Sequence, residues 1–258
     1  MNLNIKDNLF IVLGASSGFG KSVSVALLGE GAKVIAVARR QELLTQLSND
    51  YPGKIETIQA DVTLSGFDDV LLNVVAGRHI SGILINAGGP PASGFFETSE
   101  QMWLDAYHNV FLWKVRLLNR LLPLFMNQKY GRILFIESVS VKQPVENLIL
   151  SNSIRAAVAG MVKTLAAEIA NTGVTVNVLA PGYHQTAAME RLFAKRAQKE
   201  NISIEAAKDL FSAETGMGFM GNPDDLAQLA TWLLSPSSAF VTGQVISIAG
   251  NAVKGIMG

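Results

Sequence analysis

Short runs of consecutive hydrophobic residues alternate along the chain with longer segments in which hydrophobic residues recur every three to four positions. The short runs are rich in Val, Ile and Leu, which is typical of strands covered on both faces of a parallel sheet. They predict strands at Leu9–Leu13, Lys33–Val37, Ile55–Gln59, Gly82–Ile85, Arg132–Ile136, Val174–Leu179 and Gln244–Ile248. The longer segments predict helices, among them Lys21–Gly29, Gln41–Asn49, Glu100–Met126, Ser153–Ala170 and Pro223–Leu234.

This alternation predicts an α/β protein, because strand–helix–strand units form right-handed crossovers that build a doubly wound sheet. We therefore expect a single-domain Rossmann fold over residues 1–258, with a seven-stranded parallel sheet and helices on both faces. Residues 183–220 interrupt this alternation of strands and helices, and their pattern predicts one or two helices with polar faces. Because ligands bind beyond the carboxyl ends of the strands, we expect this insertion to cover the substrate, although a surface excursion fits the same pattern.

A glycine-rich turn follows the first predicted strand and precedes a predicted helix. Gly14 permits a tight turn, Gly18 allows the backbone to approach a pyrophosphate, and Gly20 allows the helix to pack closely on the strand. The first turn of a helix offers unpaired N–H groups and the positive end of the helix dipole to a phosphate. Glycines also mark ordinary turns, but this position between strand and helix favours a dinucleotide site.

The end of the second predicted strand bears on the choice between NAD and NADP. In NAD sites an acidic residue about 20 residues past the glycine loop binds the ribose 2′-hydroxyl. This chain instead has Ala38 followed by Arg39 and Arg40. A guanidinium pairs with a 2′-phosphate, which a carboxylate would repel, and the hydroxyls of Ser16 and Ser17 are further donors. We therefore expect NADP, bound by Arg39; the alternative is that both arginines are solvated residues at a helix start.

Small and polar residues follow the third and fourth predicted strands. Asp61 and Val62 come after the third strand, and Asn86, Ala87 and Gly88 come after the fourth. These positions lie at the edge of the sheet where a dinucleotide would run, so Asp61 is a candidate acceptor for the adenine amino group. The small side chains of Ala87 and Gly88 would let a ribose rest on the backbone. The same residue types are also ordinary at strand exits.

The composition narrows the classes of function. The 258 residues are 49% hydrophobic and carry 21 basic and 21 acidic residues without a basic tract, so we expect a globular protein that does not bind nucleic acid. There is no cysteine, which excludes disulfides, thiolate metal sites and a Cys nucleophile, and we expect no metal. No apolar run reaches the roughly 18 residues of a membrane span, and the N-terminus lacks a signal-peptide pattern, so we expect a cytoplasmic protein without membrane contact.

Taken together, the motifs resemble those of the short-chain dehydrogenase/reductase family, and in particular of 3-oxoacyl-carrier-protein reductases. The resemblance extends over nearly the whole chain. The motifs that carry it are Gly14-Ala15-Ser16-Ser17-Gly18-Phe19-Gly20, Asp61-Val62, Asn86-Ala87-Gly88, Asn109, Gly131-Arg132-Ile133 leading to Ser138, Pro181-Gly182 with Thr186, Gly221-Asn222-Pro223-Asp224-Asp225, and Val241-Thr242-Gly243-Gln244. The resemblance implies a cofactor site made of Gly14, Ser16, Ser17, Gly18, Phe19, Gly20, Arg39, Asp61, Val62, Asn86, Ala87, Gly88, Arg155, Pro181, Gly182 and Thr186.

The catalytic motif departs from the family. Relatives have Tyr-x-x-x-Lys, with the tyrosine 13 residues after the catalytic serine. Ser138 matches that serine, but Ser151 stands at the position of the tyrosine and Arg155 at the position of the lysine. In the family the tyrosine donates a proton to the substrate carbonyl as hydride arrives. A serine hydroxyl is a much weaker acid, and losing a general acid costs about 10²- to 10⁴-fold in rate. Arg155 keeps the positive charge and can bond ribose hydroxyls, but it does not readily release a proton.

Other side chains are weaker candidates for acid–base work. Asn109 resembles the family asparagine that holds a water or bends a helix, and without the lysine we expect a structural role. His184 and Tyr183 follow Pro181-Gly182 and are alternative proton donors, or else they line the pocket wall or face solvent. Glu137 precedes Ser138, and strand alternation directs it to the opposite face, so we expect it to be structural.

Two functions remain open at this point. The first is an NADP-dependent oxidoreductase that transfers hydride to or from a carbonyl or alcohol substrate, for example a 3-oxoacyl-like one, with non-standard proton transfer through Ser138, Asn109, Ser151 and Arg155. The second is an NADP(H)-binding protein without catalysis, acting as a sensor or a partner subunit. The intact glycine spacing argues against a third, a scaffold that binds no cofactor. The resemblance also implies a homotetramer or a homodimer, with the segments Glu100–Met126 and Ser153–Ala170 at a subunit interface and the apolar tail 252–257 against a partner.

Overall fold

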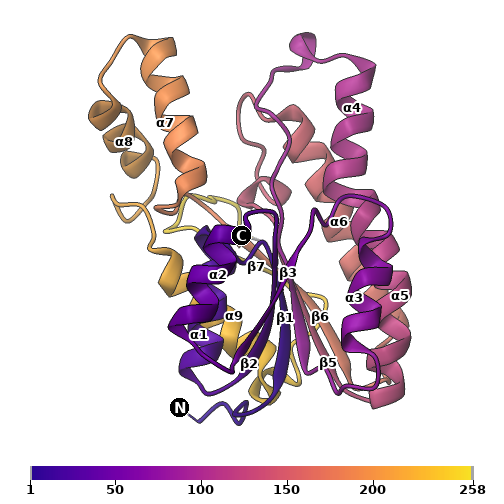
Figure 1. Ribbon diagram of the computed structural model, residues 1–258. Coiled ribbons are helices and arrows are strands. Elements are labelled where there is room, and N and C mark those ends of the chain that lie inside the picture. The colour runs from indigo at the N-terminus through magenta and orange to yellow at the C-terminus, as the bar shows by residue number, and fades with distance from the viewer. Residues whose placement is uncertain (1, 257–258) are drawn as a thin grey trace.

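A seven-stranded parallel sheet runs through the centre of the computed structural model, which describes residues 2–256 (Figure 1). The strand order is β3-β2-β1-β4-β5-β6-β7. The strands are β1 (Leu9–Leu13), β2 (Lys33–Ala38), β3 (Ile55–Gln59), β4 (Gly82–Ile85), β5 (Gly131–Ile136), β6 (Val174–Pro181) and β7 (Val245–Ile248). β2 and β3 lie on one side of β1, and β4 lies on its other side, so a switch point lies between β1 and β4. The predicted doubly wound Rossmann fold is confirmed.

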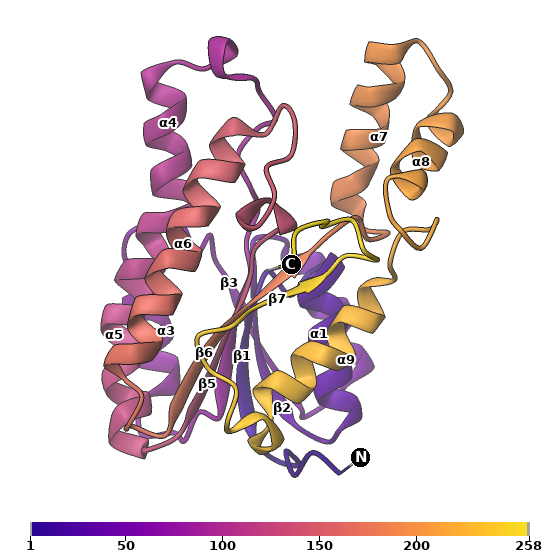
Figure 2. The same cartoon turned by 180° about the vertical axis from the view of Figure 1, so that it is seen from behind.

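Helices cover both faces of the sheet (Figures 1 and 2). The helices α1 (Gly18–Gly29), α2 (Gln41–Asp50) and α9 (Pro223–Leu234) lie on one face. On the other face lie α3 (Phe67–Val75), α5 (Trp113–Gln128) and α6 (Ile149–Glu168). Successive residues of β1 enter different cores: Ile11 packs with the α3–α5–α6 side and Phe10 with the α1–α9 side. This two-sided burial explains the unbroken hydrophobic runs of the strands.

The predicted helix Glu100–Met126 is interrupted. It consists of α4 (Glu100–Ala106), a π-helical turn η2 (Tyr107–Leu112) and α5. Such a turn frees a carbonyl from the ordinary ladder, and here the Asn109 carbonyl oxygen accepts a hydrogen bond from Trp113 Nε1 at 3.0 Å. π-Turns in helices are frequent at functional sites. Asn109, for which a structural role was expected, lies inside this turn.

Two arms rise beyond the carboxyl ends of the strands (Figures 1 and 2). One contains η1 (Phe95–Glu97) and α4, and the other contains α7 (Ala187–Glu200) and α8 (Ile204–Ala213), which form the insertion at 183–220. α7 and α8 share a small core of their own, made of Met189, Phe193, Phe211 and Met220. The remaining short helices are η3 (Val139–Val141) and η4 (Pro236–Ser238).

No helix within residues 2–256 is long and apolar enough to cross a membrane. The apolar tail segment 252–257 was expected to lie against a partner. Ile256 is fully exposed in the single chain, and Met257 lies outside the described residues.

Candidate active site

The glycine turn between β1 and α1 has the geometry that a pyrophosphate site needs. Gly14 and Gly18 adopt positive φ angles of 71° and 53°, a region that L side chains rarely enter. A Cβ on Gly20 would collide with the Gly14 carbonyl oxygen, so only glycine allows α1 to start this close to β1. Ser17 is the N-cap residue of α1 but makes no side-chain hydrogen bond to this helix. The first-turn N–H groups therefore stay available for a phosphate.

Two neighbouring arginines at the end of β2 have different positions. Arg40 Nη2 donates hydrogen bonds to Ser16 Oγ at 3.1 Å and to Ser17 Oγ at 2.5 Å. Arg39 instead points toward Asp61, with 3.6 Å between Nη1 and Oδ2, and its side chain is 76% exposed. The structure thus brings Arg40, and not the expected Arg39, onto the glycine loop.

Asp61 and Val62 follow the end of β3, at the carboxyl edge of the sheet where the glycine turn also lies. Burial acts to raise the pKa of Asp61, but hydrogen bonds from Thr63 and the charge of Arg39 outweigh it and hold that pKa below its ordinary value. Asp61 therefore stays a carboxylate near neutral pH, and its Oδ1 accepts from the Thr63 backbone N–H and hydroxyl. Val62 is buried in the core on the α3–α5–α6 side.

The turn after β4 touches the glycine loop. A Cβ on Gly14 would lie 2.8 Å from Asn86 Nδ2, so Asn86 and the loop are in contact. Ala87 packs against the core, whereas Gly88 is exposed and has open space around it. These residues leave room at the switch point of the sheet, where ligands bind in folds of this kind.

The end of β6 lies at the same carboxyl edge of the sheet, on the β4–β5 side of the glycine turn. A Cβ on Gly182 would lie 2.8 Å from the Ala249 Cβ, and the Gly182 N–H donates to the Ile248 carbonyl oxygen. Farther along the loop, the Thr186 methyl lies 3.7 Å from the Cβ position of Gly18. Pro181 ends β6 and is buried. The loop after Pro181 therefore contacts the glycine turn through Thr186.

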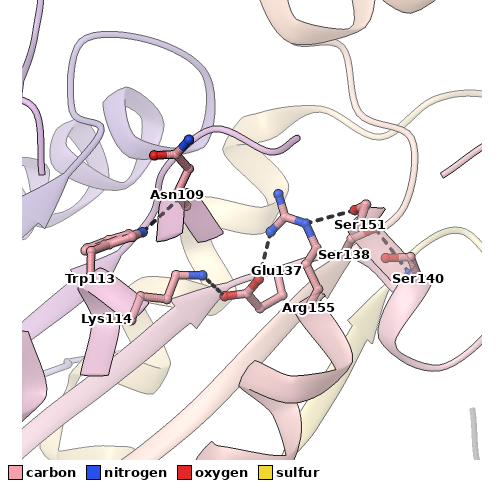
Figure 3. Close-up of polar contacts among 8 residues, drawn as sticks. All are labelled: Asn109, Trp113, Lys114, Glu137, Ser138, Ser140, Ser151 and Arg155. Atoms are coloured by element: carbon pink, nitrogen blue, oxygen red, sulfur yellow. Dashed lines mark hydrogen bonds and ion pairs between the residues drawn. The ribbon is translucent and has the colours of Figure 1, made fainter. Parts of the chain in front are cut away.

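The residues that the resemblance matches to the family's catalytic positions lie on the loop after β5 and on α6. Ser138 caps η3, and its Oγ accepts from the Ser140 N–H at 3.2 Å. Ser151 and Arg155 occupy successive turns of α6, where Arg155 Nε donates to Ser151 Oγ at 3.1 Å (Figure 3). Both side chains are buried. The Ser151 hydroxyl is thus tied to the guanidinium.

A buried carboxylate fixes the same arginine. Arg155 Nη1 donates to Glu137 Oε2 at 2.7 Å, and the other oxygen of Glu137 accepts from Lys114 Nζ (Figure 3). The Glu137 side chain is fully buried, and the side chains of Lys114 and Arg155 are 3% and 10% exposed. Burial lowers the pKa of Lys114 below its ordinary value, the Glu137 carboxylate acts in the opposite direction, and Arg155 adds to the lowering.

Sequence reasoning did not predict this cluster. Glu137 was expected to be structural, and the structure pairs it with Arg155. Lys114 follows Trp113 on a segment that was expected only as a helix at a subunit interface. A signal was available: a carboxylate directly after a strand whose last four residues are apolar.

Asn109 is exposed, and its side chain points away from the Glu137–Arg155 pair (Figure 3). Its contribution to the local structure is made by its backbone carbonyl, through Trp113. A role in proton transfer stays a prediction without a supporting contact.

The two alternative proton donors have unlike environments. Tyr183 borders a cavity, but burial and the neighbouring Glu214 carboxylate raise the pKa of its phenol, which weakens it as an acid. His184 is 3% exposed, its Nδ1 contacts the Gly182 carbonyl oxygen at 3.1 Å, and its ring meets Phe19 edge-on. His184 therefore joins the β6 loop to the glycine loop as a packing residue.

Burial lowers the pKa of His184 below its ordinary value of 6.5. The unfolded chain then binds more protons than the folded one below about pH 6.5, so stability falls as the pH falls toward the folded pKa. We expect the variant His184→Gln to lose less stability than the wild type between pH 7.5 and pH 5.5, measured by urea unfolding. The exposed His79→Gln is the control, and an equal loss in all three proteins would contradict the expectation.

A cavity of about 740 Å³ opens between the loop after β5, α7 and the C-terminal tail. Val139, next to Ser138, lines it, and so does Gly182. Leu192 and Phe211 supply an apolar wall, whereas Lys195, Arg196, Lys199, Lys254, Glu97, Glu146, Glu200 and Glu214 supply charges of both signs. Lys195 Nζ also donates to the Ala92 carbonyl oxygen, so α7 contacts the arm across the opening.

Known proteins share both the sequence pattern and the fold. The family model described as short chain dehydrogenase matches residues 8–197. The 3-oxoacyl-[acyl-carrier-protein] reductase FabG of Thermotoga maritima is 29% identical over 256 residues, which cover 97% of this chain and all of the relative. An actinorhodin polyketide ketoreductase variant, crystallised with NADPH, is 26% identical with a TM-score of 0.90 over 96% of this chain and 98% of the other.

A further neighbour agrees in fold alone. YwfH, described as an NADPH-dependent reductase involved in bacilysin biosynthesis, is 20% identical and superimposes with a TM-score of 0.92 over 97% of this chain and all of the other. The expected resemblance to 3-oxoacyl reductases is confirmed by the FabG and ketoreductase matches. Because the match to the family model extends over most of its length, this chain belongs to the short chain dehydrogenase family.

Proposed function

We propose that this protein is an NADP-dependent oxidoreductase that transfers hydride between the cofactor and a carbonyl or alcohol group of a small molecule. Its relatives are oxidoreductases, and several are named as reductases of 3-oxoacyl or polyketide substrates. A 3-oxoacyl-like substrate is therefore the first one to test.

The arrangement of Arg40 supports NADP most directly. Its guanidinium is already bonded to the hydroxyls of Ser16 and Ser17. A guanidinium and two hydroxyls at a helix N-terminus form a donor set suited to a 2′-phosphate, and the end of β2 holds no carboxylate to repel it. Arg39 would contribute charge from a more solvated position.

The order of strands orients the cofactor along the edge. Arg40 and Asp61 mark the adenosine side over β2 and β3, and the glycine turn after β1 marks the pyrophosphate. The nicotinamide half then falls to the β4–β5 side, where Arg155 Nη2 stands 2.7 Å from the Cβ position of Gly89. When bound, NADPH supplies the hydride.

The remaining chemistry falls to residues of this chain. Ser138 lies beside the cavity and can donate a hydrogen bond to a substrate oxygen. The fixed cation of Arg155 stabilises negative charge that develops nearby. Since neither a serine hydroxyl nor a guanidinium is an effective proton donor near neutral pH, we propose that the proton comes from solvent through the open cavity. The α7–α8 insertion then covers the substrate.

The direct test is titration of the wild-type protein with NADPH, followed by NADPH oxidation with 3-oxoacyl thioesters, diketones and sugars at high protein concentration. We expect binding, and turnover with at least one carbonyl substrate. Binding without turnover on any of them would instead favour the non-catalytic NADP(H)-binding protein, for which Ser151 and Arg155 are the supporting observation.

The double variant Ser151→Tyr/Arg155→Lys separates the two functions further. If the missing acid alone limits the rate, we expect an increase of about 10²- to 10⁴-fold, measured as NADPH oxidation with the best substrate. Glu137 would pair with the new lysine as it does with Arg155, so its charge would partly offset the effect of that lysine on the tyrosine. A variant that binds NADPH and stays inert would show that the substrate pocket has diverged too.

We also propose that the protein forms a homodimer or homotetramer through α5 and α6. An apolar groove of about 360 Å³ lies between them on the outer surface, lined in part by Val115, Leu118, Leu122, Met161 and Leu165. The cytoplasmic location expected from the sequence stays a prediction.

Gly160 lies at this groove, and a Cβ there would meet nothing within 4 Å. Gly160→Glu therefore leaves the single chain intact but places a charge in the interface. We expect light scattering to show a smaller assembly than the wild type, with Gly29→Glu, a second glycine with open space around it, as the control. An unchanged mass would place the subunit contacts elsewhere.

A further inference from the structure

The Lys114–Glu137–Arg155 cluster contains two cations and one carboxylate, all buried. Glu137 bridges the two cations with its two oxygens, and Lys114 lies near the rings of Trp113 and Phe135. With Lys114 protonated, the cluster carries one positive charge in excess. In such a dry environment that charge is poorly screened and acts on its surroundings more strongly than a surface charge.

The excess charge lies on the cofactor side of the site. Arg155 Nη1 and Nε are engaged by Glu137 and Ser151, whereas Nη2 reaches the exposed backbone of Gly89 at the end of β4. This is the half of the edge left for the nicotinamide once Arg40 and the glycine turn have taken the rest of the cofactor. The inference that follows rests on the proposed binding of NADP(H).

We infer that Lys114, Glu137 and Arg155 form a charge-selective element that favours NADPH over NADP⁺. The nicotinamide ring carries a positive charge when oxidised and none when reduced. A net positive charge held beside it disfavours the oxidised ring by Coulomb repulsion and leaves the reduced ring unaffected. The element thus biases the protein toward holding the reduced cofactor, as a reductase requires.

The experiment compares the dissociation constants of NADPH and NADP⁺ by isothermal titration calorimetry on the full chain. Lys114→Met keeps the Glu137–Arg155 pair and makes the cluster neutral, so the ratio of the NADP⁺ to the NADPH dissociation constant should fall about tenfold. Glu137→Gln raises the net charge to two, and the ratio should rise by a similar factor. Lys114→Met/Glu137→Gln restores a single positive charge, and the ratio should return close to that of the wild type.

Lys33→Met is the matched control. It also removes one lysine charge, but from the exposed start of β2, at the opposite edge of the sheet. Its ratio should equal that of the wild type. Circular dichroism and thermal melting establish that each variant is folded. If Glu137→Gln does not fold, Lys114→Met still tests the expected fall in the ratio, and the double variant tests its return to the wild-type value.

The outcomes separate this inference from the proposed function. If the wild type binds neither NADPH nor NADP⁺, the proposed function fails. If both bind and Lys114→Met leaves the ratio unchanged, or if the double variant moves the ratio as far as Lys114→Met does, the charge-selective element is wrong while the proposed function stands. Opposite shifts in the two single variants, cancelled in the double variant, would support it.

Discussion

Replacing Glu137 with alanine is expected to lower the free energy of unfolding by about 3–5 kcal/mol, the range measured when one partner of a buried ion pair is removed. The carboxylate is fully buried and separates two cations. Without it, Lys114 and Arg155 would be left as like charges with little solvent around them. The measurement is urea unfolding of the variant and the wild type at one pH.

The loss should depend on pH with a definite sign. Removing the carboxylate takes away the group that holds the Lys114 proton, so the pKa of Lys114 falls further below its unfolded value. The unfolded variant then binds more protons than the folded one, and its stability rises with pH as Lys114 becomes neutral. The deficit of Glu137→Ala should therefore shrink between pH 7 and pH 9.

Glu30→Ala is the control for this variant. Glu30 is exposed at the end of α1, so its removal should change stability by no more than about 0.5 kcal/mol. A Glu137→Ala loss of that same small size would show that Lys114 and Arg155 have other means of compensation and that the cluster is not a connected ion network.

Arg40→Ala is expected to weaken NADPH binding by about tenfold to a hundredfold and to leave NADH binding unchanged. A hydrogen bond to a charged group contributes about 1.5–3 kcal/mol, and each 1.4 kcal/mol is a factor of about ten in affinity. Only NADPH has the 2′-phosphate, so the loss should be confined to it. Fluorescence titration of both reduced cofactors measures the effect.

Arg39→Ala is the matched comparison. Its side chain is mostly exposed and pairs with Asp61 at 3.6 Å, a contact typical of weak surface pairs. We expect its NADPH dissociation constant to change by less than about fivefold. If Arg39→Ala has the larger effect, the 2′-phosphate binds on the Asp61 side, as the sequence alone suggested, and the bonds of Arg40 to the loop serines are incidental to the cofactor.

The elements of the sheet were predictable because each records its environment in its own residues. Leu9–Leu13 and Gly82–Ile85 have the predicted bounds, since a strand buried on both faces admits only apolar side chains along its length. The helix Pro223–Leu234 was also predicted to the residue, because Asn222 caps it and Pro223 begins it. The segment 100–126 was predicted as one helix, since the hydrophobic period continues through the π-turn.

The sequence by itself determined the fold, the glycine turn and the family. All of these depend on the spacing of residues within short segments, and that spacing fixes where each residue lies on a strand, turn or helix. Only the tertiary structure decided which arginine meets the loop serines. Arg39 and Arg40 are adjacent in the sequence, but their side chains point in different directions, and the sequence pattern does not reveal those directions. The tertiary structure also decided that Lys114, Glu137 and Arg155 meet, because they come from α5, the end of β5 and α6, and a contact between three elements depends on packing.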